Sequence, residues 1–263
     1  RRSSDLIIMI SPLAYVDASA KLGANVTVHP FAYIDKNVEI GDDCEIMPHA
    51  SIMSGTRMGK RNRIFNGAVI AAEPQDFNYK GGDTIVEIGD DNVIRENVVI
   101  NRATNSDGKT IIGNGNFLHE GVHVSHDTHI GNHSVFGYGS KISGNCMIED
   151  YVIFGGNVLV SQGCRVGRWS MTQTGCRFRK DIPPYIVAAL EPTTYYGVNS
   201  FILSHEGLSE KIIKHISHAY RIIYQGNTSI FDALLMIKDQ LPMSDEIQHI
   251  IDFINASKLG IIK

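Results

Sequence analysis

A large apolar side chain recurs at every sixth position through the first two-thirds of this 263-residue chain. The series runs from Ile10 to Ile70, resumes in the same phase from Ile88 to Ile100, and continues from Ile112 to Val166. A small or β-branched residue stands two positions before most of its members. A period of six is neither that of a helix nor that of a simple strand. It predicts the hexapeptide repeat of a parallel β-helix, in which one bulky and one small inward side chain fill each flat side.

A finer period is visible in the glycines that follow the apolar position. They fall at spacings that are multiples of eighteen, at Gly23, Gly41, Gly59, Gly113, Gly131 and Gly167. Three hexapeptides therefore make one triangular coil, and one of its corners uses a residue without a Cβ, suited to the turn. Residues eighteen apart are expected to stack at about 4.8 Å, the distance between neighbouring strands. The predicted fold is mainly β, a triangular prism.

The repeat predicts a β-helix over residues 9–184 and a second unit over residues 185–263. Two interruptions, 71–87 and 101–111, contain Pro, Gly, Asn or Asp in turn-forming combinations and predict loops that project from one edge. A plain surface loop is the alternative for the first. That loop is nevertheless rich in recognition side chains, which favours a place beside a binding site: Gln75, Asp76, Phe77 and Tyr79.

The C-terminal unit begins where the six-residue pattern ends, at Pro183 and Pro184. Prolines cannot donate to a β-ladder, so the ladder is expected to stop there. After a connecting segment to about Leu203, the apolar period becomes helical. The helices are expected to cover the open end of the β-helix. Serines or a threonine are the expected N-caps of three amphipathic helices: Ser209, Thr228 or Ser229, and Ser244.

Composition narrows the classes of partner and compartment. A net charge of −4 and a pI of about 6.3 give no reason to expect nucleic acid or a membrane surface. No apolar run approaches the roughly 20 residues of a membrane span. Residues 1–8 lack the apolar core of a signal peptide, and Met9 is a candidate natural start. We expect a cytoplasmic protein. The four cysteines occupy small inward positions, which predicts core residues rather than metal ligands: Cys44, Cys146, Cys164 and Cys176.

Five histidines fall within residues 119–133, a density that raises the possibility of zinc. Gamma-class carbonic anhydrases, which are β-helix enzymes, bind zinc between subunits through histidines. The spacing disfavours such a site here. His123 and His129 precede the apolar position by one and are expected to point outward along strands, whereas His126 lies near a corner. A metal cage would require neighbouring subunits, and we predict no metal.

The eighteen-residue period also places His126, Gly144 and Gln162 in one column. An imidazole can remove a proton from a hydroxyl near neutral pH, and a neighbouring backbone amide can stabilise an oxyanion. Asp127 is a candidate partner that would orient the imidazole and set its tautomer. A surface histidine with no role is the alternative interpretation.

Several segments resemble one known family, over nearly the whole chain. They are EPQDFNY, VEIGDDNVIREN, HVSHDTHIGNH, DIPPY and YGVN, and they are similar to UDP-N-acetylglucosamine 3-O-acyltransferase. The resemblance implies a homotrimer of left-handed β-helices with active sites between subunits. It also implies transfer of an (R)-3-hydroxyacyl group from the phosphopantetheine of acyl carrier protein to the sugar 3-hydroxyl, the first step of lipid A biosynthesis, with no separate cofactor.

The resemblance also assigns roles to residues. It implies that His126 is the general base, that Asp127 orients it, and that the Gly144 amide stabilises the oxyanion. The sugar nucleotide would be contacted by Gln75, Asp76, His123, Gln162 and Asn199. Some positions of the substrate site depart from the family pattern: Asn78 replaces a lysine, Asn145 and Ser161 replace histidines, His205 and Glu206 replace basic residues, and Thr174 replaces a glycine associated with acyl-chain length.

An acidic carrier protein predicts a basic landing surface. The candidates are Arg165, Arg168, Arg179 and Lys180, with Lys141 and Arg177 on the outward column of His123. Two alternatives stay open. One is a divergent enzyme that acylates another nucleotide sugar at oxygen or nitrogen. The other is a non-catalytic scaffold or carrier-protein binder, against which the retained His126, Asp127 and Gly144 argue.

Overall fold

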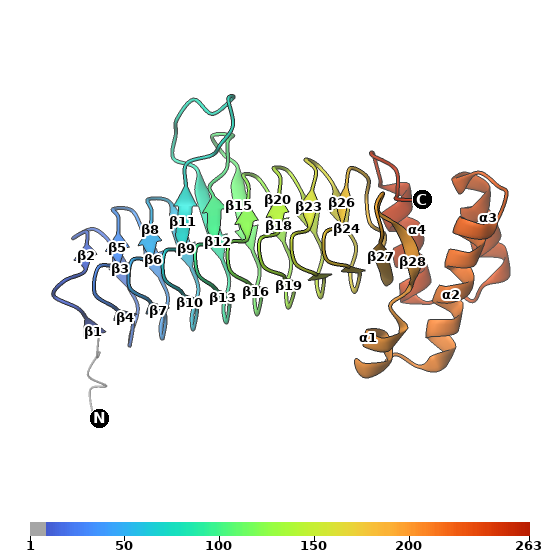
Figure 1. Cartoon of the computed structure of the whole chain (residues 1–263), viewed down its shortest axis with the longest axis horizontal. Helices are drawn as coiled ribbons and strands as arrows, with labels where there is room; N and C mark the ends of the chain where they lie inside the picture. The colour runs from blue at the N-terminus through green and yellow to red at the C-terminus, as the bar shows by residue number, and fades with distance from the viewer. Residues whose placement is uncertain (1–8) are drawn as a thin grey trace.

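The molecule is a long three-sided prism of short parallel strands with a group of helices at its C-terminal end (Figure 1). The structure is a computed structural model and describes residues 9–263. The expectations for residues 1–8 therefore lie outside the described residues. The left-handed parallel β-helix of hexapeptide repeats with a C-terminal helical part is confirmed.

Three sheets form the sides of the prism. Sheet A consists of β1 (Met9–Ile10), β4 (Thr27–Val28), β7 (Glu45–Ile46), β10 (Arg63–Ile64), β13 (Val93–Ile94), β16 (Phe117–Leu118), β19 (Val135–Phe136), β22 (Ile153–Phe154), β25 (Met171–Thr172), β27 (Ile186–Ala189) and β28 (Thr194–Val198). Sheet B consists of β2 (Tyr15–Val16), β5 (Tyr33–Ile34), β8 (Ser51–Ile52), β11 (Val69–Ala72), β14 (Val99–Asn101), β17 (His123–Val124), β20 (Lys141–Ile142), β23 (Leu159–Val160) and β26 (Arg177–Phe178). Sheet C consists of β3 (Lys21–Leu22), β6 (Glu39–Ile40), β9 (Thr56–Met58), β12 (Ile85–Ile88), β15 (Lys109–Ile112), β18 (His129–Ile130), β21 (Met147–Ile148) and β24 (Arg165–Val166).

The eighteen-residue register holds along most of the prism but not across the interruptions. Arg63 pairs with Glu45, eighteen residues earlier, yet on its other side it pairs with Val93, thirty residues later. Val93 in turn pairs with Phe117, twenty-four residues later. These two longer coils together span 54 residues, three times eighteen. The sequence pattern therefore resumes in phase although one coil fewer is present than the period predicts.

The corner glycines are required by close packing between coils, and not by the turn conformation that the sequence led us to expect. A Cβ on Gly41 would lie 2.7 Å from the backbone of Gly59 in the next coil, so close stacking of backbones excludes a side chain. The residue with a left-handed backbone stands two positions later, for example Asp43 with φ 58°. Asp and Asn tolerate this conformation better than most residues with a side chain.

The inward residues form one continuous apolar core. The bulky members of the repeat, such as Ile64 and Ile100, are fully buried, and the four cysteines are buried and free. The interpretation of the cysteines as core residues is confirmed. Burial raises the pKa of the Cys146 and Cys164 thiols to about 12, which keeps them protonated and unreactive as nucleophiles.

Both interruptions leave the prism at the corner between sheets B and C and project side by side in Figure 1. The first connects β11 to β12 and covers residues 73–84, and the second connects β14 to β15 and covers residues 102–108. Both are shorter than the predicted 71–87 and 101–111, because the strands that flank them extend further than the two residues of an ordinary coil.

The ladder does not stop at the prolines, and that prediction is wrong. Strand β27 follows them and pairs in parallel with β25, and β28 then adds an antiparallel strand. Pro184 occupies a corner position, where a Cβ on Gly167 of the preceding coil would lie 2.4 Å from its nitrogen. Because the prolines lie in a turn and not within a strand, their missing N–H groups interrupt no ladder bond.

Four helices complete the chain: α1 (Ser200–His205), α2 (Glu210–Gln225), α3 (Ile230–Gln240) and α4 (Asp245–Asn255). Helix α1 lies partly in the segment predicted to be a connection. Ser209, Ser229 and Ser244 each accept a hydrogen bond from a backbone N–H of the first turn, so the predicted caps are confirmed. The helices gather at the C-terminal end of the prism, as expected (Figure 1). Within residues 9–263, no helix combines the length and apolar character that crossing a membrane requires.

Candidate active site

The candidate site lies at the corner between sheets B and C, which we call the His126 corner and define as residues 125–128, 143–146 and 161–164. These segments connect β17 to β18, β20 to β21 and β23 to β24 in three successive coils. Both projecting loops leave the same corner in the two preceding coils, the second loop one coil and the first loop two coils before His126. The fold thus brings residues from the loops to the edge where the histidine column stands.

His126 and Asp127 form a close pair in a largely buried setting. The side chain of His126 is 9% exposed, and its Nδ1 lies 2.8 Å from Oδ2 of Asp127. A carboxylate only accepts, so Nδ1 carries a proton, and in the neutral ring Nε2 presents a lone pair. Asp127 has a left-handed backbone with φ 56°, which turns its side chain back toward the imidazole. This arrangement is suited to a general base whose tautomer is fixed by a carboxylate.

Asp76 of the first loop faces the other side of the imidazole. Its Oδ2 lies 3.7 Å from Nε2 of His126, and its Oδ1 accepts hydrogen bonds from the backbone and side-chain nitrogens of Asn78. The Asn78 amide is the main cause that holds the pKa of Asp76 below its ordinary value, and the nearby His126 acts in the same direction. Asp76 is therefore an ionised acceptor at the mouth of the site.

Gly144 lies directly against the imidazole. A Cβ at this position would lie 2.4 Å from Cε1 and 2.5 Å from Nε2 of His126, so only glycine leaves room for the ring. Among residues 9–263, no backbone acceptor takes the Gly144 N–H. A free amide beside the basic nitrogen is the arrangement required for oxyanion stabilisation.

Sheet B beside the corner carries a column of outward residues. His123 on β17 pairs in register with Lys141 on β20, which pairs with Leu159 on β23. Burial, with a smaller contribution from the charge of Lys141, lowers the pKa of His123. His123 is therefore a neutral imidazole at neutral pH, able to donate one hydrogen bond and accept another.

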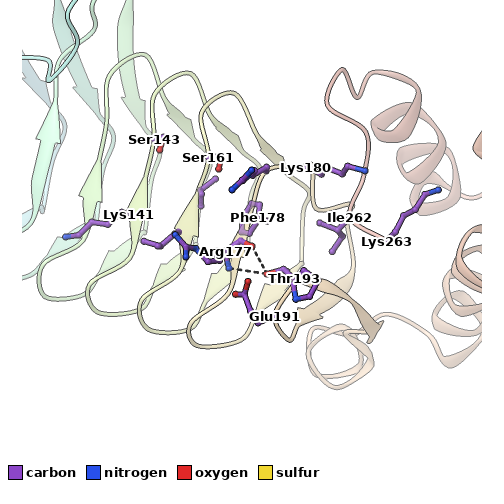
Figure 2. A pocket seen from close by; sticks show the side chains of 14 residues that line it. Lys141, Ser143, Ser161, Arg177, Phe178, Lys180, Glu191, Thr193, Ile262 and Lys263 are labelled. Carbon is purple, nitrogen blue, oxygen red and sulfur yellow. Dashed lines mark hydrogen bonds between the residues drawn. The ribbon is translucent and has the colours of Figure 1, made fainter.

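A groove with a volume of about 770 Å³ runs along sheet B toward the C-terminus (Figure 2). Its lining includes Ser143 and Ser161, the residues immediately before Gly144 and Gln162 in the His126 corner. Thr193 also lines it, and its Oγ1 accepts from the Arg177 N–H at 3.1 Å. One acidic residue, Glu191, lines the groove. The cationic lining residues are Lys141, Arg177, Arg179, Lys180 and Lys263.

The other predicted residues of the His126 corner lie where the register places them. The Asn145 N–H donates to the His126 carbonyl at 3.0 Å, and the Gly163 N–H donates to the Gly144 carbonyl at 3.0 Å. These bonds stack the three corner segments, so that Gln162 follows Gly144 one coil later. Gln162 and Gln75 are both exposed, Gln75 next to Asp76 on the first loop.

Three predicted substrate residues lie elsewhere on the chain. Thr174 lies at the corner between sheets A and B, where its Oγ1 accepts from the Gly156 N–H. Asn199 lies near the corner between sheets C and A, where its Nδ2 donates to the Trp169 carbonyl at 3.0 Å. His205 is exposed at the end of α1. Within one chain these three residues therefore do not lie beside His126, and their place in a site between subunits stays a prediction.

The predicted basic surface is also divided. Arg179 and Lys180 line the groove, but Arg165 and Arg168 do not. The Arg165 guanidinium donates to the Phe253 carbonyl at 3.1 Å and lies over the Phe253 ring, so it fixes helix α4 to the prism. Arg168 lies at the corner between sheets C and A, with Nη2 3.7 Å from Oδ2 of Asp150. The four cations do not form one patch, because consecutive strands face different sides of the prism.

The histidines of residues 119–133 do not converge on one point. Within residues 9–263, no three His, Cys, Asp or Glu side chains come together in a way that could hold a metal ion. His119 packs against Phe117, and His133 stacks on Tyr151 at another corner.

Sequence reasoning missed the residues that surround Asp127. Its N–H donates to Oγ1 of the buried Thr110 at 2.9 Å, and its Oδ2 accepts from the Thr104 N–H at 3.0 Å. Gly108 lies against its other carboxylate oxygen. Thr104 and Gly108 belong to the second interruption, whose composition predicts only turns. The groove residues Glu191, Thr193 and Lys263 follow the repeat and carry no periodic signal.

Comparison with known proteins is consistent with this geometry. A family of bacterial transferase hexapeptide repeats matches residues 109–144, and the family described as Udp N-acetylglucosamine O-acyltransferase, domain 2, matches residues 181–262. The fold and the site thus define a hexapeptide-repeat acyltransferase.

Full-length relatives identify the family. The acyl-(acyl-carrier-protein)–UDP-N-acetylglucosamine O-acyltransferase of Xanthomonas oryzae pv. oryzae is 41% identical over 257 residues, which cover 97% of this chain and 98% of that protein. The enzyme of the same name from Janthinobacterium is 38% identical over 97% of this chain and 99% of its own. The structure of the UDP-N-acetylglucosamine acyltransferase of Bacteroides fragilis superposes with a TM-score of 0.96 at 52% identity, covering 97% of this chain and 100% of that one. This chain belongs to the acyl-(acyl-carrier-protein)–UDP-N-acetylglucosamine O-acyltransferase family.

Proposed function

We propose that this protein transfers an (R)-3-hydroxyacyl group from acyl carrier protein to the 3-hydroxyl of UDP-N-acetylglucosamine, the first step of lipid A biosynthesis. Membership of the family supports the substrates. One observation supports the mechanism: the imidazole of His126 stands between the Asp127 carboxylate, 2.8 Å from its Nδ1, and Gly144, which lies against its Cε1 and Nε2.

In the proposed reaction, Nε2 of His126 takes the proton of the sugar 3-hydroxyl while the oxygen attacks the thioester carbonyl. The Gly144 N–H donates to the oxyanion that forms on that carbonyl. The C–S bond then breaks, the ester remains on the sugar, and the phosphopantetheine sulfur leaves with the proton held by the imidazolium. Asp127 stabilises the imidazolium throughout without taking its proton. The chemistry is balanced with the two substrates alone.

We propose that the active form is a homotrimer with sites between subunits, as the resemblance implies. The positions of Thr174 and Asn199 support this arrangement. Each lies at a different corner of the prism from His126, so either can reach a His126 site only from a second copy of the chain. Mass spectrometry under native conditions would give the number of subunits.

We propose that the groove on sheet B receives the acyl carrier protein or its phosphopantetheine arm. Five cationic side chains and the Glu191 carboxylate line it, which suits an acidic partner, and its lining residue Ser143 adjoins Gly144. Arg179 and Lys180 retain their proposed role in this scheme, whereas Arg165 and Arg168 lie outside it. A cytoplasmic location is proposed as well, supported by free thiols at the neighbouring Cys146 and Cys164.

The decisive experiment offers several 3-hydroxyacyl carrier proteins and nucleotide sugars and identifies the products by mass spectrometry. We expect an acylated UDP-N-acetylglucosamine, and we expect His126→Ala to lower kcat by at least about 100-fold, the usual contribution of a general base. His129→Ala is the matched control, because His129 is exposed on the neighbouring strand β18.

Three outcomes would contradict the proposal. Equal rates for the wild type and His126→Ala would remove the mechanism. A product formed only from another nucleotide sugar would indicate a divergent acyltransferase. Capture of acyl carrier protein without consumption of the thioester would indicate a binding protein.

A further inference from the structure

The Asp127 carboxylate is held by more than its histidine. The side chain of Asp127 is 11% exposed, and a carboxylate in so buried a place needs several donors. Oδ2 accepts from Nδ1 of His126 at 2.8 Å and from the Thr104 N–H at 3.0 Å. The Asp127 backbone is fixed separately by Oγ1 of Thr110, which accepts its N–H.

The other carboxylate oxygen is confined by Gly108. A Cβ on Gly108 would lie 2.6 Å from Oδ1 of Asp127 and 3.1 Å from both the Ala103 Cβ and the Asn105 carbonyl. The Gly108 N–H donates to that same carbonyl of Asn105 at 2.8 Å, which closes the loop on itself. The φ angle of Gly108 lies outside the left-handed region, so the local backbone accepts alanine and only the neighbouring atoms exclude it.

We propose that the second projecting loop, residues 102–108, positions the Asp127 carboxylate, with Gly108 and the Thr104 amide as positioning residues for the reaction. Thr104 holds Oδ2 and Gly108 borders Oδ1, so the loop sets the direction in which Oδ2 faces His126. The inference rests on the proposed function, in which Asp127 orients the general base. The inference assigns a positioning role to a loop that does not itself take part in the proposed reaction.

Gly108→Ala tests this directly, because it adds one methyl group against Oδ1 and removes no polar group. We expect kcat to fall by about 10- to 100-fold, the cost of a displacement of the order of 1 Å in a catalytic constellation. The KM for the nucleotide sugar should stay within about twofold, since the sugar contacts are elsewhere. Ser106→Ala, on the exposed part of the same loop, is the control and should keep the wild-type kcat.

A double-mutant cycle separates positioning from general damage. If Gly108 acts through Asp127, then adding Gly108→Ala to Asp127→Asn should lower kcat by no more than about threefold further, because contacting residues are not additive. Multiplication of the two single effects would overturn the inference. Thr104→Pro, which removes the amide donor without adding a group at 108, provides a second variant if Gly108→Ala proves unstable, and an unchanged kcat in it would also contradict the inference.

Assaying the wild-type enzyme in parallel separates a failure of this inference from a failure of the proposed function. An inactive wild type would contradict the proposed function. An active wild type together with wild-type kcat in Gly108→Ala would contradict the role of the loop alone.

Discussion

At residue 144 the identity of the amino acid is set by its neighbour and not by its own backbone. Gly144 is not among the residues with a left-handed φ, and the turn would accept alanine. The imidazole of His126 nevertheless occupies the space that a Cβ would need, with Cε1 2.4 Å away. In the proposed mechanism glycine serves two purposes here, because it admits the imidazole and leaves its N–H available to the oxyanion.

Gly144→Ala should therefore impair catalysis by moving the imidazole, although the backbone amide is kept. We expect kcat to fall by about 100-fold or more, in line with the loss of a well-placed catalytic group. Steady-state kinetics of the purified variant would measure this. Gly197→Ala is the control, because Gly197 has no atom within 4 Å of its Cβ position and no left-handed φ. A Gly144→Ala enzyme as active as that control would show that the His126 imidazole can accommodate a Cβ at residue 144.

At the scale of elements, the first loop is held by Arg102, the first residue of the second loop. The side chain of Arg102 is 15% exposed. Its guanidinium donates to the Ser54 carbonyl at 3.3 Å, to Oε1 of Glu73 at 3.2 Å and to the Tyr79 hydroxyl at 2.9 Å. The Tyr79 N–H in turn donates to the Asp76 carbonyl at 3.0 Å. Arg102 therefore joins the coil below to the turn that aims Asp76 at His126.

Arg102→Met should release this loop while it leaves the His126–Asp127 pair in place. We expect the KM for the nucleotide sugar to rise by about tenfold with a smaller change in kcat, because the loop carries proposed sugar contacts and not the base. Arg102→Lys should restore only part of the affinity, since a single ammonium cannot reproduce the planar fork. Arg63→Met removes the same charge from an exposed site on sheet A and should leave KM unchanged. A pure loss of kcat in Arg102→Met would contradict this role for the loop.

The elements that the sequence predicts best are those fixed by local periodicity. The inward residues of each coil, such as Ile64, and the serine caps of the helices follow from patterns within a few residues. Strands β27 and β28 escape prediction because Pro183 and Pro184 end the visible repeat, although they lie only in a corner. The eighteen-residue period also predicts one coil too many around the loops. The two coils that carry the loops together span 54 residues, the length of three ordinary coils.

At the scale of the whole molecule, the sequence predicted only the part of the candidate site that depends on the stacking of successive coils. The column of His126, Gly144 and Gln162 follows from the eighteen-residue period. The approach of Asp76 and the enclosure of Asp127 by Thr104 and Gly108 do not, because loop conformations depend on distant contacts with no period. The cations were misplaced for a related reason: neighbours in sequence lie on different sides of a prism.

A second pair of carboxylate and imidazole, half-buried, joins the prism to the helical part. Oε2 of Glu149 lies 2.9 Å from Nε2 of His249 on α4, and the Tyr185 hydroxyl lies 2.9 Å from Nδ1 of the same ring. Burial tends to raise the pKa of Glu149, but the hydrogen bond and charge of His249 and the Arg168 amide outweigh it, so the pKa lies below the ordinary value of 4.5.

A lowered pKa in the folded state gives a defined pH dependence of stability. The ionised Glu149 stabilises the fold at pH values above its ordinary pKa, and this contribution is lost as the pH falls through the lowered value. Between about pH 5.5 and pH 3.5, we expect the wild type to lose about 2–4 °C more in Tm than Glu149→Gln does, the equivalent of about 1 kcal/mol in a chain of this size. Glu210→Gln is the matched control, because Glu210 pairs with Lys214 on the exposed face of α2 and exposed pairs contribute little. Parallel Tm curves for the wild type and Glu149→Gln over this range would mean that the contact between the prism and α4 does not depend on the charge of Glu149.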